Sequence, residues 1–155
     1  MIYRLAKMLY NGGFTNSKRI MQRIPGLYIA ASELAGRGVF TAQAVPEGAL
    51  VEVAPVIVIP KTQVGSIHAT VLHDFYFRWN RDLDDAAIAL GYGSLYNHSF
   101  EPNLRFELDF GNQTIDFYAA RPISAGEELT INYNGDAWNK TPLWFHETDN
   151  SKRTV

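Results

Sequence analysis

The feature that most limits how this chain can fold is a pair of alternating segments in its second half. In residues 104–110, apolar Leu and Phe side chains alternate with Arg, Glu and Asp, and residues 114–119 show the same two-residue period. A period of two places the apolar side chains on one face of a strand. Gly111 and Asn112 between the segments predict a two-residue hairpin turn. We therefore expect an antiparallel hairpin here.

Most of the remaining chain also divides into short candidate strands between turns. Glycine and proline recur at intervals that suit strands better than long helices. Further strands are expected at 27–31, 38–42, 49–59 and 129–133, with turns at 45–48 and 123–126. These segments predict a mainly β fold.

The best helix candidate is residues 66–79. Ser66 is a candidate N-cap, and Leu72, Phe75, Tyr76 and Trp79 follow the spacing of one helix face. Acidic residues at 82, 84 and 85 predict an exposed loop after it. We expect residues 61–87 to form one short helical insert in the β fold.

Composition narrows the classes of protein that this chain can represent. Its 155 residues suit one compact domain, and 46% of them are apolar. It contains no cysteine, which excludes disulfides, thiolate metal sites and cysteine nucleophiles, and which fits a reducing compartment. No signal peptide and no apolar run of the ~20 residues needed to span a membrane are recognisable. We expect an intracellular protein, cytoplasmic first, with a nuclear or host-directed location left open.

The charges are distributed unevenly along the chain. Residues 1–26 carry five basic and no acidic side chains, so residues 27–155 carry nine basic and sixteen acidic ones, a net charge of −7. An acidic body attracts cationic partners and repels phosphates, so direct binding of nucleic acid is not expected. The basic N-terminal segment is a solvated arm in the simplest interpretation; a nucleic-acid contact or an organelle transit segment remain alternatives.

Three segments carry unusual polar or glycine-rich patterns. They are Gly36-Arg37-Gly38, residues 95–103 (LYNHSFEPN) and residues 125–135 (AGEELTINYNG). Each has an ordinary explanation when taken alone: a tight turn, a loop whose side chains satisfy local backbone groups, and a surface turn leading into a core-edge tyrosine. The histidines show no metal-binding spacing, since His68 and His73 are five residues apart, and we expect no metal.

Taken together, the order and spacing of these segments resemble the SET-domain protein-lysine N-methyltransferases. The family's GxG turn is matched at residues 36–38, its NHSxxPN motif at 97–103 and its GEEL…Y motif at 126–133. Three positions depart from the common pattern: Phe100 replaces a cysteine, Asn132 an aspartate and Ser94 an arginine. Without flanking cysteines, the chain is similar to minimal bacterial or viral members that lack zinc-bound modules.

The resemblance implies a fold and a division of the chain. The expected fold is the SET-domain, β-clip-like arrangement of small curved sheets, in which a C-terminal segment threads through an earlier loop in a knot-like crossing. We expect a basic N-terminal segment at 1–26, the SET domain at 27–135, and a tail at 136–155. The aromatic residues of this tail either form a lid over the cofactor and the lysine channel or close the edge of the core.

The resemblance also implies an activity: methyl transfer from S-adenosyl-methionine to a lysine ε-amine. The substrate would be a basic, histone-like protein or peptide, and a homodimer is left open. Tyr133 is the expected catalytic residue. The expected cofactor-binding residues are Arg37, Gly38, Asn97, His98, Tyr133 and Trp138, and the expected substrate-channel residues are Tyr92, Tyr96 and Trp144. The alternative is a catalytically weak SET-like module that binds a basic peptide or a cofactor.

Overall fold

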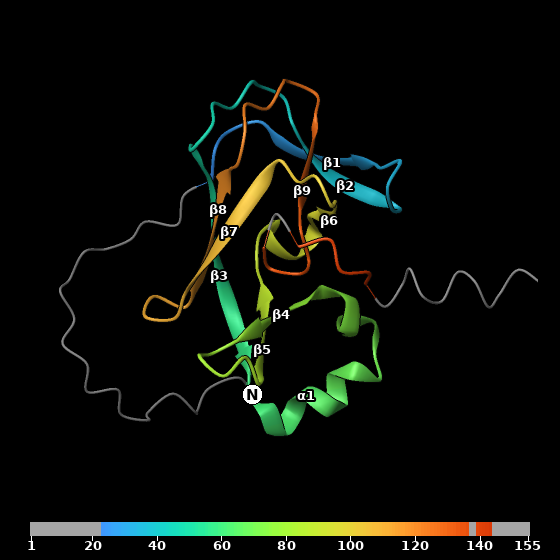
Figure 1. Cartoon of the computed structure of the whole chain (residues 1–155), viewed down its shortest axis with the longest axis vertical. Helices are drawn as coiled ribbons and strands as arrows, with labels where there is room; N and C mark the ends of the chain where they lie inside the picture. The colour runs from blue at the N-terminus through green and yellow to red at the C-terminus, as the bar shows by residue number, and fades with distance from the viewer. Residues whose placement is uncertain (1–22, 137–138, 144–155) are drawn as a thin grey trace, which may run out of the picture.

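Strands dominate the computed structural model, which describes residues 23–136 and 139–143 (Figure 1). The strands are β1 (Leu27–Ala31), β2 (Arg37–Thr41), β3 (Leu50–Ile59), β4 (Tyr76–Trp79), β5 (Asp85–Ala89), β6 (Asn97–His98), β7 (Leu104–Asp109), β8 (Thr114–Ala119) and β9 (Glu128–Ile131). Within the described residues, helical structure is limited to α1 (Lys61–His68) and two 3₁₀ turns, η1 (Val71–Phe75) and η2 (Gly93–Leu95). The mainly β prediction is therefore confirmed.

The strands form two sheets that share one apolar core. One sheet has the order β1-β2-β9-β6 and the other the order β4-β5-β3-β8-β7. Figure 1 shows the first sheet towards one end of the molecule and α1 at the opposite end. Val39 of β2, Leu129 of β9 and Phe117 of β8 are fully buried and belong to the same cluster. This packing fixes the two sheets against each other.

The predicted hairpin is present, but its turn is longer than expected. β7 and β8 pair in register from Leu104 opposite Ala119 to Asp109 opposite Thr114, which leaves four residues, 110–113, in the loop. Asp109 accepts hydrogen bonds from the backbone and side chain of Asn112, at 3.0 and 2.8 Å. These bonds stabilise a four-residue turn between β7 and β8, so the predicted two-residue turn is wrong.

The predicted helix at 66–79 is also wrong, because three different structures share that segment. α1 begins at Lys61, directly after Pro60, and ends at His68, so Ser66 lies inside it and is not its N-cap. The hydroxyl of Thr70 accepts a hydrogen bond from Leu72 N (3.2 Å) and starts η1 instead. β4 then pairs with β5. Strand pairing of an aromatic segment thus overrides its helical spacing.

The acidic loop has a structural role at the start of α1. Asp85 Oδ1 accepts a hydrogen bond from Lys61 N (2.8 Å), and Asp84 pairs with Lys61 Nζ at 2.7 Å. The first helical N–H has no partner within its own helix, so the Asp85 carboxylate satisfies it. Asp85 is also the first residue of β5 rather than part of the loop.

β9 joins segments that are far apart in the sequence. It pairs antiparallel with β2 and parallel with β6, with Asn97 opposite Thr130 and His98 opposite Ile131. The NHS segment therefore contains a two-residue strand, although its polar sequence favours a loop. This arrangement brings all three motifs together, while the threading of the tail remains a prediction.

Residues 23–26 lie against the domain rather than apart from it. Ile24 N donates to Val51 O at 2.9 Å, and Ala42 N donates to Gly26 O at 2.8 Å. The rest of the predicted basic segment lies outside the described residues, and its role remains a prediction. In the described part of the chain, no helix has the length and apolar character needed to cross a membrane.

Candidate active site

Two cavities meet at Tyr133. The first, of about 730 Å³, lies along the glycine turn and the NHS segment and is lined by Gly36, Arg37, Asn97 and His98. The second, of about 340 Å³, lies between β4, β7 and the turn after β9. Within the described residues, four line both cavities: Asp74, Phe75, Ser94 and Tyr133. We call them the glycine-turn cavity and the aromatic cavity.

A compact polar cluster forms one wall of the glycine-turn cavity. Asn97 Nδ2 lies 2.7 Å from Glu128 Oε1 and 3.1 Å from the Arg37 carbonyl oxygen. The Ser32 hydroxyl donates to Glu128 Oε2 at 2.8 Å. A Cβ added at Gly38 would lie 2.0 Å from Glu128 Oε1, so only glycine leaves room for this carboxylate. The glycine turn and the NHS and GEEL motifs thus build one cluster.

His98 is held beside Tyr133 by backbone and ring contacts. Its Nδ1 accepts a hydrogen bond from Tyr133 N at 3.3 Å, and the two rings lie 5.3 Å apart. Phe100, at the position of the family's common cysteine, packs edge-on against the His98 ring at 4.5 Å. Phe100 thus makes an apolar contact with His98 at the position where the family commonly has a cysteine.

Tyr133 is one of the residues shared by the two cavities. Its hydroxyl donates a hydrogen bond to the Tyr96 carbonyl oxygen at 3.0 Å. Burial raises the pKa of Tyr133 to about 12, and the negative charge of Asp74 adds to this shift. The phenol therefore stays protonated through the physiological pH range and serves as a hydrogen-bond donor, not as a base.

Aromatic side chains dominate the second cavity. Phe75, Tyr76, Phe77, Phe106, Tyr96 and Tyr133 are among its lining residues. Phe77 packs edge-on against Phe106 at 5.3 Å. Asp74 also lines this cavity, and its Oδ1 is 3.0 Å from His73 Nδ1. A cavity with aromatic walls and a single carboxylate at its junction suits a long aliphatic side chain that ends in an amine.

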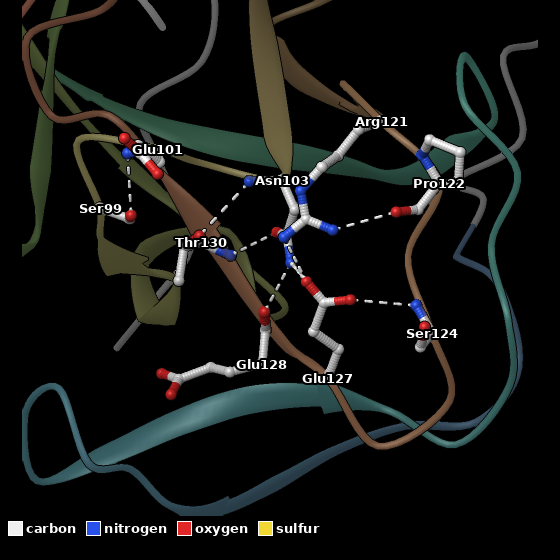
Figure 2. A network of polar contacts seen from close by, with 9 residues as sticks. All are labelled: Ser99, Glu101, Asn103, Arg121, Pro122, Ser124, Glu127, Glu128 and Thr130. Atoms are coloured by element: carbon white, nitrogen blue, oxygen red, sulfur yellow. Dashed lines mark hydrogen bonds and ion pairs between the residues drawn. The ribbon is translucent and has the colours of Figure 1, made fainter.

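The two glutamates of the GEEL motif point in opposite directions. Glu128 faces Asn97, while Glu127 forms an ion pair with Arg121 and accepts hydrogen bonds from Asn103 Nδ2 and Ser124 N, both at 3.0 Å. Figure 2 shows one oxygen of Glu127 facing Arg121 and Asn103 and the other facing Ser124, with the Glu128 side chain directed away from them. Glu127 therefore braces the strand, whereas Glu128 contacts Asn97, which lines the glycine-turn cavity.

Asn103 closes the NHSxxPN motif and fixes β9. It is 1% exposed; its Oδ1 accepts from Thr130 N at 2.8 Å, and its Nδ2 donates to the Glu128 carbonyl oxygen at 2.7 Å. The Asn103 side chain thus makes two hydrogen bonds to the backbone of β9, as a neighbouring strand would (Figure 2). These bonds hold β9, which ends at Ile131, two residues before Tyr133.

Acid should weaken the fold through Glu127. Its hydrogen bond to Arg121 lowers the pKa of Glu127 to about 2. Because the folded pKa lies below the unfolded value, this stabilisation is present above about pH 4.5 and is lost as the pH falls towards 2. We expect Glu127→Gln to lower the free energy of unfolding at pH 7 by about 2 kcal/mol, since a 28% exposed side chain contributes less than the full pKa difference.

The test is urea unfolding at pH 7 and pH 3. The difference between wild type and Glu127→Gln should shrink at pH 3. Glu107→Gln is the matched control, because Glu107 pairs with Arg105 at the surface with 61% of its side chain exposed. An equal loss in both variants at pH 7 would show that the Glu127 network has no special contribution.

Two departures from the family pattern have local explanations. Asn132 donates from Nδ2 to the Asn139 carbonyl oxygen at 2.7 Å and accepts from Asn134 N at 3.0 Å. An ionised aspartate has no N–H and could not make the first bond. The Ser94 hydroxyl accepts from Ala89 N at 3.0 Å and lines both cavities.

The remaining predicted channel residues have different positions. Tyr96 lines the aromatic cavity, although it is 1% exposed and its hydroxyl donates to Glu52 rather than into the open space. Tyr92 is not among the described residues that line either cavity; its ring lies 4.5 Å below the Arg23 guanidinium. Trp138 and Trp144 lie outside the described residues, so their predicted roles remain predictions.

Sequence reasoning missed Ser32, Asp74 and Glu52. Ser32 and Asp74 belong to no motif, and nothing in their neighbourhood marks them. Glu52 did have a signal, because it is the only charged residue in the apolar strand β3. In the described residues, no group of three His, Cys, Asp or Glu side chains could hold a metal ion.

Comparisons with known proteins agree on one family. The family model described as "SET domain" matches residues 36–134. A histone-lysine N-methyltransferase from Schizosaccharomyces pombe, named as specific for histone H3 lysine 37, is 34% identical over 131 residues, which cover 83% of each chain. The histone-lysine N-methyltransferase SET5 of Vanderwaltozyma polyspora is 55% identical over 40 residues, covering 26% of this chain and 8% of that protein.

A solved structure supports the same grouping. The crystal structure of a Plasmodium falciparum protein, titled as a histone methyltransferase, is 28% identical to this chain with a TM-score of 0.61. The match covers 76% of this chain and 99% of that one. The motifs, the fold and these similarities therefore point to the same family.

Proposed function

This chain belongs to the SET-domain family and is a protein-lysine N-methyltransferase of that type, and we propose that it moves a methyl group from S-adenosyl-methionine to a lysine ε-amine of a basic protein. The observation that carries the proposal is the junction of two cavities at Tyr133. One cavity would hold the cofactor and the other the lysine side chain.

The glycine-turn cavity fits the chemical groups of the proposed cofactor. Leu34, Phe75 and Leu95 offer an apolar surface for a purine ring. Arg37 offers a cation for a carboxylate, and Asn97 lies beside the Glu128 carboxylate in a region suited to an ammonium group. When bound there, S-adenosyl-methionine would supply an activated methyl group on a positively charged sulfur.

The chain's own residues would align the reacting groups. The Tyr133 hydroxyl is fixed by its bond to the Tyr96 carbonyl oxygen, and the Tyr133 backbone by its bond to His98. Holding reactants in line converts a bimolecular reaction into an effectively unimolecular one. We propose that Tyr133 is the catalytic residue and that it acts by orienting the amine.

The lysine must arrive at the junction as a neutral amine, since an ammonium group has no lone pair. Removal from water in this cavity disfavours the charged form of an inserted lysine, whereas the Asp74 carboxylate favours it, so burial must outweigh Asp74 for the lysine pKa to fall. The protonated Tyr133 phenol then needs only to accept or donate a hydrogen bond. No strong general base is required, because bulk solvent can take the proton before the chemical step.

A basic protein is the proposed substrate class. Residues 27–155 carry a net charge of −7, and Asp74 places one of these charges at the junction. The S. pombe and V. polyspora relatives are named as histone-lysine methyltransferases, which supports a histone-like substrate. Incubation with methyl-labelled cofactor and a histone mixture, followed by mass spectrometry, tests this proposal.

The outcomes separate the activity from simple binding. Label on a lysine side chain would support methyl transfer. Binding of the cofactor without transfer of label to any histone in the mixture would instead favour the non-catalytic module. Failure of the wild-type chain to bind S-adenosyl-methionine in calorimetry would contradict the proposed cofactor.

Salt should weaken the reaction with basic peptides. Attraction between exposed charges is screened over about 8–10 Å at physiological ionic strength. We expect kcat/KM for a Lys- and Arg-rich peptide to fall several-fold between low and physiological salt, with kcat less affected. A neutral peptide with the same lysine is the control, and its kcat/KM should change little. Equal activity on acidic and basic peptides at low salt would contradict the proposed substrate class.

A further inference from the structure

Glu52 is a buried carboxylate directly behind the candidate active site. It lies on β3 and is 3% exposed. Its Oε1 accepts a hydrogen bond from Tyr92 N at 3.0 Å, and its Oε2 accepts one from the Tyr96 hydroxyl at 2.8 Å. Both donors belong to one short segment, residues 92–96, which contains η2. A single carboxylate therefore ties together the two ends of this turn.

Burial of the Glu52 carboxylate is unfavourable by itself and requires space among the surrounding residues. Burial raises the pKa of Glu52, which reflects the unfavourable removal of a carboxylate from water. Gly91 has a φ of +70°, and a Cβ there would lie 2.4 Å from Glu52 Oε1. The Arg23 backbone pairs with Glu52, and its guanidinium lies over Tyr92. The close approach of Glu52 Oε1 to Gly91 is the feature that depends on the carboxylate itself, since the Arg23–Glu52 pairing is a backbone contact.

The turn that Glu52 holds is also the one that supports the catalytic tyrosine. Ser94 lines both cavities, and the Tyr96 carbonyl oxygen accepts the hydrogen bond from the Tyr133 hydroxyl. A continuous chain of contacts thus runs from the Glu52 carboxylate through the two polar ends of Tyr96 to the hydroxyl of Tyr133. The Tyr96 ring between them packs against Phe117 at 4.8 Å and is almost fully buried.

We propose that Glu52 is a positioning residue for methyl transfer: it fixes residues 92–96, and through the Tyr96 carbonyl oxygen it sets the direction of the Tyr133 hydroxyl. This inference rests on the proposed function and adds a residue to it. Glu52 touches neither of the proposed reactants, so it acts only through Tyr96 and Tyr133.

Asp116 gives a useful contrast within the same core. It is also a carboxylate on a central strand and is 3% exposed. It accepts a hydrogen bond from the Thr114 hydroxyl of its own strand at 2.9 Å. Asp116→Asn therefore tests the general effect of changing a buried carboxylate, and it should leave the rate of methyl transfer unchanged.

Tyr96→Phe is the most direct test, because it removes one hydroxyl and keeps the buried ring. We expect kcat to fall about tenfold, since loss of alignment rather than of binding is involved. The dissociation constant for S-adenosyl-methionine and the KM for the peptide should stay within about twofold of wild type. Glu52→Gln should retain most of the rate, because its amide can donate to the Tyr96 oxygen while its carbonyl accepts from Tyr92.

A double-mutant cycle separates positioning from a purely structural contribution. Tyr96→Phe is combined with Tyr133→Phe, and single-turnover rates of labelled methyl transfer are measured. If Glu52 and Tyr96 act by aiming the Tyr133 hydroxyl, Tyr96→Phe should have less than about a twofold effect when that hydroxyl is absent. Thermal unfolding and cofactor calorimetry confirm that each variant is folded.

The outcomes distinguish this inference from the function on which it rests. An undiminished rate in Tyr96→Phe, or the same tenfold loss with and without the Tyr133 hydroxyl, would overturn the role of Glu52 alone. Normal turnover by Tyr133→Phe would overturn the catalytic assignment as well. A tenfold loss that disappears in the Tyr133→Phe background, together with retained activity in Glu52→Gln and Asp116→Asn, would support the inference.

Discussion

Tyr133→Phe should lower the rate of methyl transfer by at least about 100-fold, because a small misalignment of reacting groups can cost this much. The variant keeps the ring and its contact with His98, and it removes the hydroxyl that donates to the Tyr96 carbonyl oxygen. Single-turnover transfer of labelled methyl to a histone peptide measures the loss. The melting temperature and the affinity for S-adenosyl-methionine should stay near those of wild type.

The pH dependence provides a second readout for Tyr133. Since the pKa of Tyr133 is about 12, its titration should not appear in the rate profile between pH 7 and 10. A rise in rate over that range would report deprotonation of the substrate lysine. Tyr28→Phe is the control for removing a tyrosine hydroxyl, because Tyr28 lies on β1 and stacks on Phe40. Normal turnover by Tyr133→Phe would move the catalytic assignment elsewhere.

Asn97→Ala should weaken binding of S-adenosyl-methionine by about 1–3 kcal/mol, the usual consequence of leaving buried polar partners unsatisfied. That energy corresponds to a roughly 5- to 150-fold increase in Kd. Asn97 Nδ2 contacts the Glu128 carboxylate and the Arg37 carbonyl oxygen, so its loss would leave both acceptors without this donor beside the glycine-turn cavity. Isothermal titration calorimetry measures the change directly.

Asn97→Asp makes the same test more demanding. It would place a second carboxylate where Asn97 Nδ2 now lies 2.7 Å from Glu128 Oε1, and repulsion between like charges should disturb the cluster more than alanine does. Asn112→Ala is the control, because Asn112 lies in the β7–β8 loop, where its side chain donates to Asp109. Wild-type affinity in Asn97→Ala would remove this residue from the proposed cofactor site.

Much of the β framework could be predicted because local patterns determine it. β1 occupies the predicted residues 27–31, and β2 and β3 each begin within one residue of the predicted position. β7 and β8 follow from their two-residue period. Errors occurred where a distant partner overrides the local preference. Residues 76–79 have helical spacing, yet they become β4 because β5 supplies the hydrogen-bonding edge.

For the three motifs, the sequence predicts which residues belong to the site but not which contacts they make. Gly38, Asn97 and Glu128 could be selected as parts of motifs from their order alone, and the fold brings them into one cluster. Their individual contacts were not predictable. Nothing in the spacing of Glu127 and Glu128 indicates that one braces Asn103 while the other faces Asn97.

The sequence by itself determined the mainly β fold, the family, and the three segments that build the candidate site, because periodicity, turn residues and motif spacing are local properties of the chain. Only the tertiary structure decided that Glu52, 44 positions before Tyr96, lies against the Tyr96 hydroxyl. It also decided that Asp74 shares the junction with Tyr133. Such contacts depend on which strands pair and in which register, and a side chain has no local signal for a partner that reaches it only when the chain is folded.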